Sequence, residues 1–314
     1  MGSTFAVKWH GAADPQAVRA AVDAELAAAE STFSQWTDQS EIQRFNRHRS
    51  TKPFAASERL RQALALGLQV AAATDGAFDP TVRPLIEVFR RQRRDSAYQP
   101  TVSEIAAARA GVDYRRVRIE DESICKADAG TEIDLDGLVA GLVADRLATQ
   151  LESLAVHDFL LEITGEVLAR GVRPDGTPWR TGVVDPERSD PGHEVALVTV
   201  PLRDRALCTS GDYRNVVVRD GVITSHIFDP RTGTNPQHGV VSVSVLCRSC
   251  ALADALGTAL MVLGPSGARA AIAKCAEPDA AALFVMLRKD GQLDRKSTRL
   301  NSSHSSVSRM PSSA

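Results

Sequence analysis

The segment at residues 137–154 reads GLVAGLVADRLATQLESL, and it is followed closely by FLLEI at 159–163 and EVLARG at 166–171. Leucines in the first segment recur at helical spacing, whereas the next two segments are short apolar runs typical of strands. More strand-like runs come next, so the chain changes here from a mainly helical half to consecutive strands. This order predicts an α+β fold with antiparallel sheets and flanking helices, rather than a doubly wound parallel sheet.

Before residue 137 the pattern is mainly helical. Ala12–Phe33 and Ser57–Thr74 both carry apolar residues at helical spacing, and the second begins with a serine suited to an N-cap. Gly76 suits the left-handed position that follows many helices. Thr101 and Glu104 have the spacing of a capping box, which predicts a short third helix.

Beyond residue 171 we expect strands, with helix returning only at Cys250–Leu263. Asp220-Gly221 is a strong hairpin signal between two of these strands. We expect the glycine-containing segment Thr209–Tyr213 to be a loop. The expected strands are Thr181–Val184, Val195–Leu202, Arg214–Arg219, Val222–Phe228 and Val240–Leu246.

Composition limits the classes of function. The chain has 314 residues, 43% of them hydrophobic, which is enough for one large domain or two fused lobes. Its 37 basic and 39 acidic residues give a net charge of −2, so we expect no nucleic-acid partner. Five cysteines are present, and Cys247 and Cys250 form a CxxC pair. We favour ordinary thiols there over a redox or zinc site, because zinc needs four ligands.

Membrane insertion is not expected from the hydropathy of the sequence. No stretch approaches the roughly 20 apolar residues that span a bilayer, and Met1–Lys8 lacks the order of a signal peptide. As written, the product is expected to be cytoplasmic. The serine-rich segment 295–314 has no apolar period, so we expect a disordered tail that is non-native read-through.

Two acidic side chains, Asp134 and Asp136, precede Gly137 at the expected junction of an apolar run with a helix. Backbone N–H groups at such a junction bind anions, and carboxylates there need a cation in order to tolerate phosphate. The alternative, at about equal weight, is that the aspartates only cap the helix.

A second constellation lies in the last expected helix. Asp254 and Thr258 are four residues apart, so they share a helix face. One carboxylate and one hydroxyl facing together suit Mg²⁺, which takes few protein ligands and completes its shell with water and phosphate. Alone, such a pair is more often a buried hydrogen bond.

A third constellation is HIFDPRTG at 226–233, which ends an expected strand in a Pro/Gly turn. His226, Asp229 and Arg231 on one loop suit proton transfer combined with phosphate recognition. A solvated turn with a surface histidine is the competing interpretation.

Seven short segments of the sequence, given at the end of this paragraph in chain order, resemble the ApbE family of FAD:protein FMN transferases. The resemblance spans residues 1 to about 264. It implies a T-fold-like, two-lobed single domain, which we place at residues 1–294. The matching segments are MGSTF (1–5), SEIQRFN (40–46), TDGAFDPT (74–81) with Pro84-Leu85, IDLDG (133–137) with Asp145, TSGDY (209–213), HIFDPRTG (226–233) and ADALGT (253–258).

The resemblance implies an FAD site and a magnesium site. The side chains of Asp254 and Thr258 match metal ligands, with the Gly137 carbonyl and Gly257 at further ligand positions. Trp36 stands where tyrosine is common in the family. The residues that match FAD contacts are Met1, Trp36, Ala77, Phe78, Asp79, Asp134 and Ile227.

The implied activity is transfer of FMN from FAD to a Ser or Thr hydroxyl of an acceptor flavoprotein, with release of AMP. The family's acceptors carry a Ser/Thr-Gly-Ala-Ser/Thr-like motif, and many members are periplasmic lipoproteins at the inner membrane. His226 is our candidate for the base and Asp229 for the group that orients it. The alternatives are an FAD pyrophosphatase that yields FMN and AMP, and a flavin-binding protein without turnover.

Overall fold

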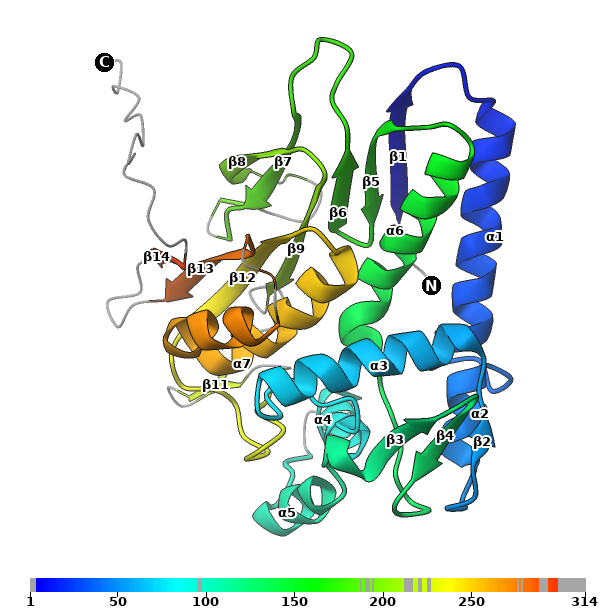
Figure 1. The fold of residues 1–314 in the computed structure, drawn as a ribbon. Coiled ribbons are helices and arrows are strands. Elements are labelled where there is room, and N and C mark those ends of the chain that lie inside the picture. The colour runs from blue at the N-terminus through cyan, green and yellow to red at the C-terminus, as the bar shows by residue number, and fades with distance from the viewer. Residues whose placement is uncertain are drawn as a thin grey trace.

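A large antiparallel sheet dominates the computed structural model, with strand order β1-β5-β6-β9-β12-β13-β14 (Figure 1). The structure describes residues 4–94, 98–186, 188–189, 193, 195–211, 217–219, 222–224, 227–275, 277, 279–287 and 293–298, with the backbone alone at 92–93, 217–219 and 222–224. The strands of the large sheet are β1 (Phe5–His10), β5 (Asp158–Ile163), β6 (Glu166–Arg170), β9 (Arg205–Gly211), β12 (Val240–Cys247), β13 (Ala281–Leu287) and β14 (Leu293–Ser297).

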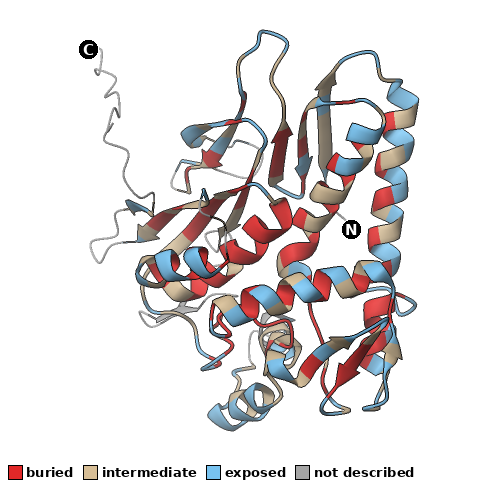
Figure 2. Ribbon diagram, in the orientation of Figure 1, coloured by how far each residue is buried: buried red, intermediate tan, exposed pale blue. Residues whose placement is uncertain are grey.

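Three helices pack beside this sheet: α1 (Pro15–Phe33), α6 (Asp136–Ser153) and α7 (Cys250–Lys274) (Figure 1). Helix α7 is buried along most of its length (Figure 2). Counted as one helix across the kink at Gly264, it is long and apolar enough to cross a membrane by length and composition; the part before the kink is the helix expected at Cys250–Leu263. Because 72% of its most apolar window is buried inside the protein, the apolar character of α7 is explained by its place in the core.

The second lobe is built on a small sheet of β2 (Phe54–Ala55), β4 (Ser123–Lys126) and β3 (Val117–Glu120). The expected N-cap at Ser57 and the expected capping box of Thr101 and Glu104 are both confirmed, and Gly76 has the expected positive φ. The sheets and helices together confirm the predicted two-lobed α+β architecture. The helices of this lobe are α2 (Glu41–Arg47), α3 (Glu58–Ala73), α4 (Arg83–Arg94), α5 (Val102–Ala110) and the 3₁₀ helix η1 (Tyr114–Arg116).

Two hairpins complete the fold. Strands β7 (Trp179–Val184) and β8 (Ala196–Leu202) form an antiparallel pair, and their apolar side chains pack with β6 and β9 in a second small core. Strands β10 (Val217–Arg219) and β11 (Val222–Thr224) form an antiparallel pair, as the predicted hairpin requires, and the Asp220-Gly221 connection itself lies outside the described residues.

Helices α6 and α7 approach each other very closely where Gly141 faces the start of α7. A Cβ atom at Gly141 would lie 2.4 Å from the carbonyl oxygen of Cys250. One turn further along α6, Asp145 accepts hydrogen bonds from Ser249 Oγ at 2.8 Å and from the backbone N–H groups of Cys250 and Ala251 at 2.9 and 3.0 Å. Glycine and aspartate on α6 thus fix the position of α7.

Several sequence expectations need correction. Thr209–Gly211 is not a loop but the end of β9, a strand inside the large sheet that pairs with β6 and β12. Helix α4 and strand β13 were not predicted. The disordered tail was expected from Arg295, but Leu293–Ser297 pairs with β13, because the backbone alone supplies the hydrogen bonds of an edge strand. The remainder of the tail, from residue 299, lies outside the described residues.

The cysteines lie inside the protein, and the expectation of ordinary thiols stays a prediction. All five are free and buried, and Cys247 and Cys250 lie at the end of β12 and the start of α7. The sulfurs of Cys250 and Cys208 lie 3.5 Å apart and share a hydrogen bond, not a disulfide.

Candidate active site

Residues from both lobes line a cavity of about 480 Å³. This volume lies in the range of small-molecule sites. Helices α4, α6 and α7, strand β9 and the loops at 77–79 and 227–230 contribute to its wall. The described lining residues are Ala77, Phe78, Asp79, Val82, Ile86, Phe89, Arg90, Asp134, Asp136, Gly137, Glu166, Thr209, Ser210, Gly211, Ile227, Phe228, Pro230, Thr258 and Val262.

The loop after α3 holds its shape through its own hydroxyl and carboxylate groups. The backbone N–H of Phe78 donates to Thr74 Oγ1 at 3.2 Å. Asp79 Oδ1 accepts from the N–H and hydroxyl of Thr81 at 2.7 and 2.6 Å, and Oδ2 accepts from Tyr114 N–H at 3.0 Å. Ala77, Phe78 and Asp79 all line the cavity as predicted, but the Asp79 carboxylate is already bound inside the protein.

Asp134 is held by its neighbour Ile133, whose N–H and carbonyl both bond to the Asn46 side chain, at 2.7 and 2.9 Å. Its Oδ1 accepts from the N–H of Asp136, the first residue of α6, at 3.0 Å. Its Oδ2 is buried in the cavity wall without a hydrogen-bond partner, and the residue is only 5% exposed. One oxygen thus supports the turn into α6, as the capping interpretation predicts, and the other has no partner within the protein, so binding of a cation or anion at this motif stays a prediction.

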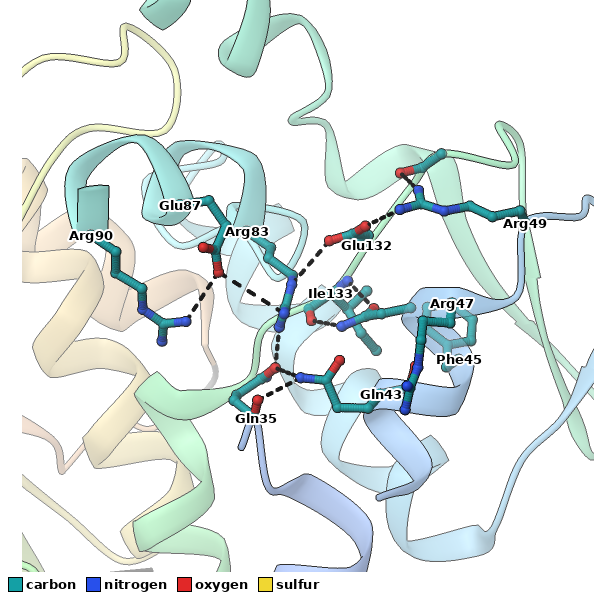
Figure 3. A network of polar contacts seen from close by, with 12 residues as sticks. Gln35, Gln43, Phe45, Arg47, Arg49, Arg83, Glu87, Arg90, Glu132 and Ile133 are labelled. Carbon is teal, nitrogen blue, oxygen red and sulfur yellow. Dashed lines mark hydrogen bonds and ion pairs between the residues drawn. The ribbon is translucent and has the colours of Figure 1, made fainter. Parts of the chain in front are cut away.

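A polar network supports this wall of the cavity (Figure 3). Arg83 of α4 donates to Gln35 and lies 3.0 Å from Glu132 Oε2. Glu132 also accepts from Arg49 at 2.6 Å. The network ties the loop after α1 and the segment before Asp134 to the same helix.

The four residues predicted to bind metal come from two adjacent helices, and two of them, Gly137 and Thr258, line the cavity, whereas Asp254 and Gly257 do not. A Cβ atom at Gly137 would lie 3.0 Å from Thr258 Oγ1, so these residues face each other across the α6–α7 contact. A Cβ atom at Gly257 would lie 2.6 Å from Ser210 Oγ at the cavity wall. Asp254, one turn before Thr258 on α7, accepts from Gly141 N–H rather than from the threonine hydroxyl.

Most of the charged side chains that line the cavity are carboxylates. Burial raises the pKa of Asp134, and also that of Asp254, which does not line the cavity. Burial and then the Asp254 carboxylate raise the pKa of Glu166, and burial and then Asp134 raise that of Asp136. Arg90 is the one lysine or arginine among the described lining residues. Carboxylates gathered in this way favour a bound proton or cation.

The residues present fit a hard cation such as Mg²⁺. Among the residues that the structure describes, no group of three or more His, Cys, Asp or Glu side chains is placed to hold a metal ion. The set predicted here is of another kind, with one carboxylate from Asp254 and one hydroxyl from Thr258. The missing side chain of Gly137 leaves the space beside Thr258 Oγ1 open, and oxygen donors are those that Mg²⁺ prefers.

Some predicted residues lie elsewhere. Trp36 is outside the cavity lining and is 78% exposed, with the Arg90 guanidinium over its ring. Asp229 bonds with both carboxylate oxygens to Arg231, at 2.7 to 2.9 Å, in a turn closed by a bridge to Thr234. Met1 and His226 lie outside the described residues. Ile227, which directly follows His226, lines the cavity as predicted.

Sequence reasoning missed the contribution of α4 and β6. Val82, Ile86 and Phe89 line the cavity, and the Phe89 ring stacks on Phe228 with centroids 4.7 Å apart. Their spacing of four and three residues is a helical period that could have been recognised. Glu166 at the start of β6 had no local signal.

The comparisons with known proteins agree on one family. The ApbE family model matches residues 1–284 of this chain. The FAD:protein FMN transferase of Vibrio cholerae serotype O1 is 35% identical, over 84% of this chain and 79% of that protein. The FAD:protein FMN transferase of Klebsiella pneumoniae is 33% identical, over 82% of this chain and 74% of that protein.

Solved structures give the same result. The flavin transferase ApbE from Vibrio cholerae has a TM-score of 0.83 at 31% identity, covering 95% of this chain and 94% of that one. The apo form of the Pseudomonas stutzeri flavinyl transferase ApbE has a TM-score of 0.84 at 34% identity, covering 95% and 92%. The chain therefore belongs to the ApbE family.

Proposed function

We propose that the protein transfers FMN from FAD to a Ser or Thr hydroxyl of an acceptor flavoprotein, with release of AMP, in a reaction that depends on Mg²⁺. The observation that carries the proposal is the shared cavity. Segments far apart in the sequence bring Phe78, Asp134, Gly137, Ile227 and Thr258 to one cavity, in a chain whose relatives are named for this activity.

Asp254 and Thr258 would hold the metal by their side chains, with Gly137 and Gly257 at the further ligand positions. When bound, Mg²⁺ supplies charge neutralisation at the pyrophosphate and stabilises the leaving AMP. The support is chemical and steric: the donors are oxygens, and two glycines keep side chains out of the space beside Thr258 and Ser210.

Asp134 offers the flavin substrate a hydrogen-bond acceptor. Its Oδ2 is buried and unpartnered, and a buried acceptor of this kind is stabilised when a ligand supplies a donor. FAD has hydroxyl and N–H donors. The apolar wall made by Phe78, Phe89, Ile227 and Phe228 would exclude water from the bound cofactor.

His226 is proposed as the base that takes the proton of the acceptor hydroxyl. Its neighbour Ile227 lines the cavity, which supports a position close to the reacting groups. Asp229 is proposed to orient His226, although its oxygens are held by Arg231. The acceptor is expected to carry a Ser/Thr-Gly-Ala-Ser/Thr-like motif.

The test is to incubate the protein with FAD, Mg²⁺ and a domain that carries the acceptor motif, and then to weigh the domain. Transfer raises its mass by one FMN less water and releases one AMP. A domain with alanine at the acceptor position and a reaction with EDTA are the controls. Free FMN and AMP without a mass gain would identify a pyrophosphatase, and unchanged FAD a flavin-binding protein without turnover.

A further inference from the structure

Arg90 connects the cavity to an exposed aromatic ring that lies outside it. Its guanidinium carbon lies 5.4 Å from the centroid of the Trp36 ring. The same group pairs with Glu87 at 3.1 Å and lies 3.9 Å from Asp136 at the cavity wall. Its side chain is only 23% exposed, and Figure 3 shows it beside Glu87 on α4.

Trp36 is held differently in its backbone and in its ring. Ser34 Oγ accepts from the N–H groups of Trp36 and Thr37 at 3.3 and 3.2 Å, and Arg83 holds the neighbouring Gln35. The loop is therefore well supported. Trp36 as a whole residue is 78% exposed, an unusual position for a large aromatic residue, and the arginine lies over its ring.

We infer that Arg90 is a positioning residue for the flavin half of the substrate, acting through Trp36. The inference rests on the proposed function. Held by Glu87 and Asp136, the planar guanidinium fixes the orientation of the indole at the edge of the cavity and leaves most of the ring exposed to receive a flat aromatic ring. The isoalloxazine of FAD or FMN is the ligand of that chemistry, and ADP lacks it.

Preorganisation is the physical reason for such an arrangement. A tryptophan that is free to rotate loses conformational freedom when it stacks on a ligand, whereas one already held by a cation loses less. Without Arg90 the indole loses both the cation–π contact and its fixed orientation. Flavin binding should then weaken by about 5- to 30-fold.

The test measures dissociation constants of FAD, FMN and ADP for Arg90→Gln and Arg90→Lys, with no acceptor present. We expect Arg90→Gln to weaken FAD and FMN by about 5- to 30-fold and ADP by less than about twofold. Lysine should restore part of the affinity, since it keeps the charge. The matched control is Arg91→Gln, which removes the same charge from the next residue; Arg91 is 66% exposed, contacts Tyr98 and does not line the cavity.

A double-mutant cycle separates action through Trp36 from direct action. In a Trp36→Ala background, Arg90→Gln should change the FAD dissociation constant by less than about twofold. The inference is overturned if Arg90→Gln has its full effect in that background, weakens ADP as much as FAD, or changes nothing. Transfer to the acceptor is scored separately, so FAD binding with this pattern but without transfer would reject the proposed function alone. A wild-type protein that binds no FAD would reject both.

Discussion

Asp254 Oδ2 accepts a hydrogen bond of 3.0 Å from the backbone N–H of Gly141. The contact joins the two helices that form the predicted metal site, at the point where a glycine lets them approach. Gly141 lies one turn after Gly137 on α6, and Asp254 lies one turn before Thr258 on α7. The close approach of α6 and α7 at Gly141 therefore determines both how the two helices pack and where the predicted ligands lie.

Replacing Asp254 by asparagine should remove the charge while the side-chain oxygen still accepts from Gly141. We expect FMN transfer to fall by about 10²–10³-fold, the range for losing one strong electrostatic stabiliser, with no loss in melting temperature. Asp145→Asn is the control: it makes the same change at a residue that accepts from the first N–H groups of α7, so it should lower the free energy of unfolding and reduce transfer per folded molecule much less than Asp254→Asn does. Full activity of Asp254→Asn at limiting Mg²⁺ would refute the metal assignment.

Two glycine substitutions should separate packing from chemistry. Alanine at Gly141 would meet the backbone carbonyl of Cys250, which cannot rotate away, so the helices must separate. We expect a loss of about 1–3 kcal/mol or more in the free energy of unfolding. Alanine at Gly257 would meet the hydroxyl of Ser210, which can rotate, so activity should fall more than stability. Denaturant unfolding and transfer assays on both variants give the comparison, and equal losses of stability would contradict it.

The sequence predicts best what is decided locally. The capping box of α5, the N-cap of α3 and the hairpin signal at residues 220–221 depend on a few adjacent residues, and all three predictions hold. Helix α4 was missed because its short apolar stripe is followed by closely spaced arginines, which hide the period. Strand β9 was missed because it ends in Thr-Ser-Gly, which resembles a turn, yet its start is buried between β6 and β12.

The candidate site was predicted in part for the same reason. Motif order located Phe78, Asp134 and Thr258, because each lies in a short segment with its own pattern. Arg90 and Glu166 could not be predicted, since they reach the cavity through contacts between α4, β6 and residues more than 30 positions away. Such contacts depend on how the lobes pack, which no local pattern records.

Lys126 should give the protein a measurable alkaline dependence of stability. The residue is 2% exposed, its ammonium donates to the carbonyls of Phe45 and His48, and burial lowers its pKa to about 8. Between about pH 8 and the ordinary lysine pKa near 10.4, the unfolded chain keeps a proton that the folded protein has released. The free energy of unfolding should therefore rise with pH in this window, by about 1–3 kcal/mol.

The measurement is urea unfolding at pH 7.5 and pH 10 for the wild type and for Lys126→Met, which has no group that titrates at this site. Other groups titrate in both proteins, so the difference between them isolates Lys126. We expect the wild type to gain stability relative to the variant as the pH rises. A difference that stays constant would show that the lysine keeps its ordinary pKa when folded.

His226 gives the sharpest test of the mechanism. If it takes the acceptor proton, His226→Ala should slow single-turnover transfer by about 10²–10⁴-fold and leave the dissociation constant of FAD nearly unchanged. If it only stabilises its turn, the variant should melt at a lower temperature and transfer normally in the cold. Two further variants test Asp229, because this carboxylate is held by Arg231. Equal effects of Asp229→Asn and Arg231→Gln would mean that Asp229 acts only by closing the turn, whereas slower transfer in Asp229→Asn alone would support its role in orienting His226.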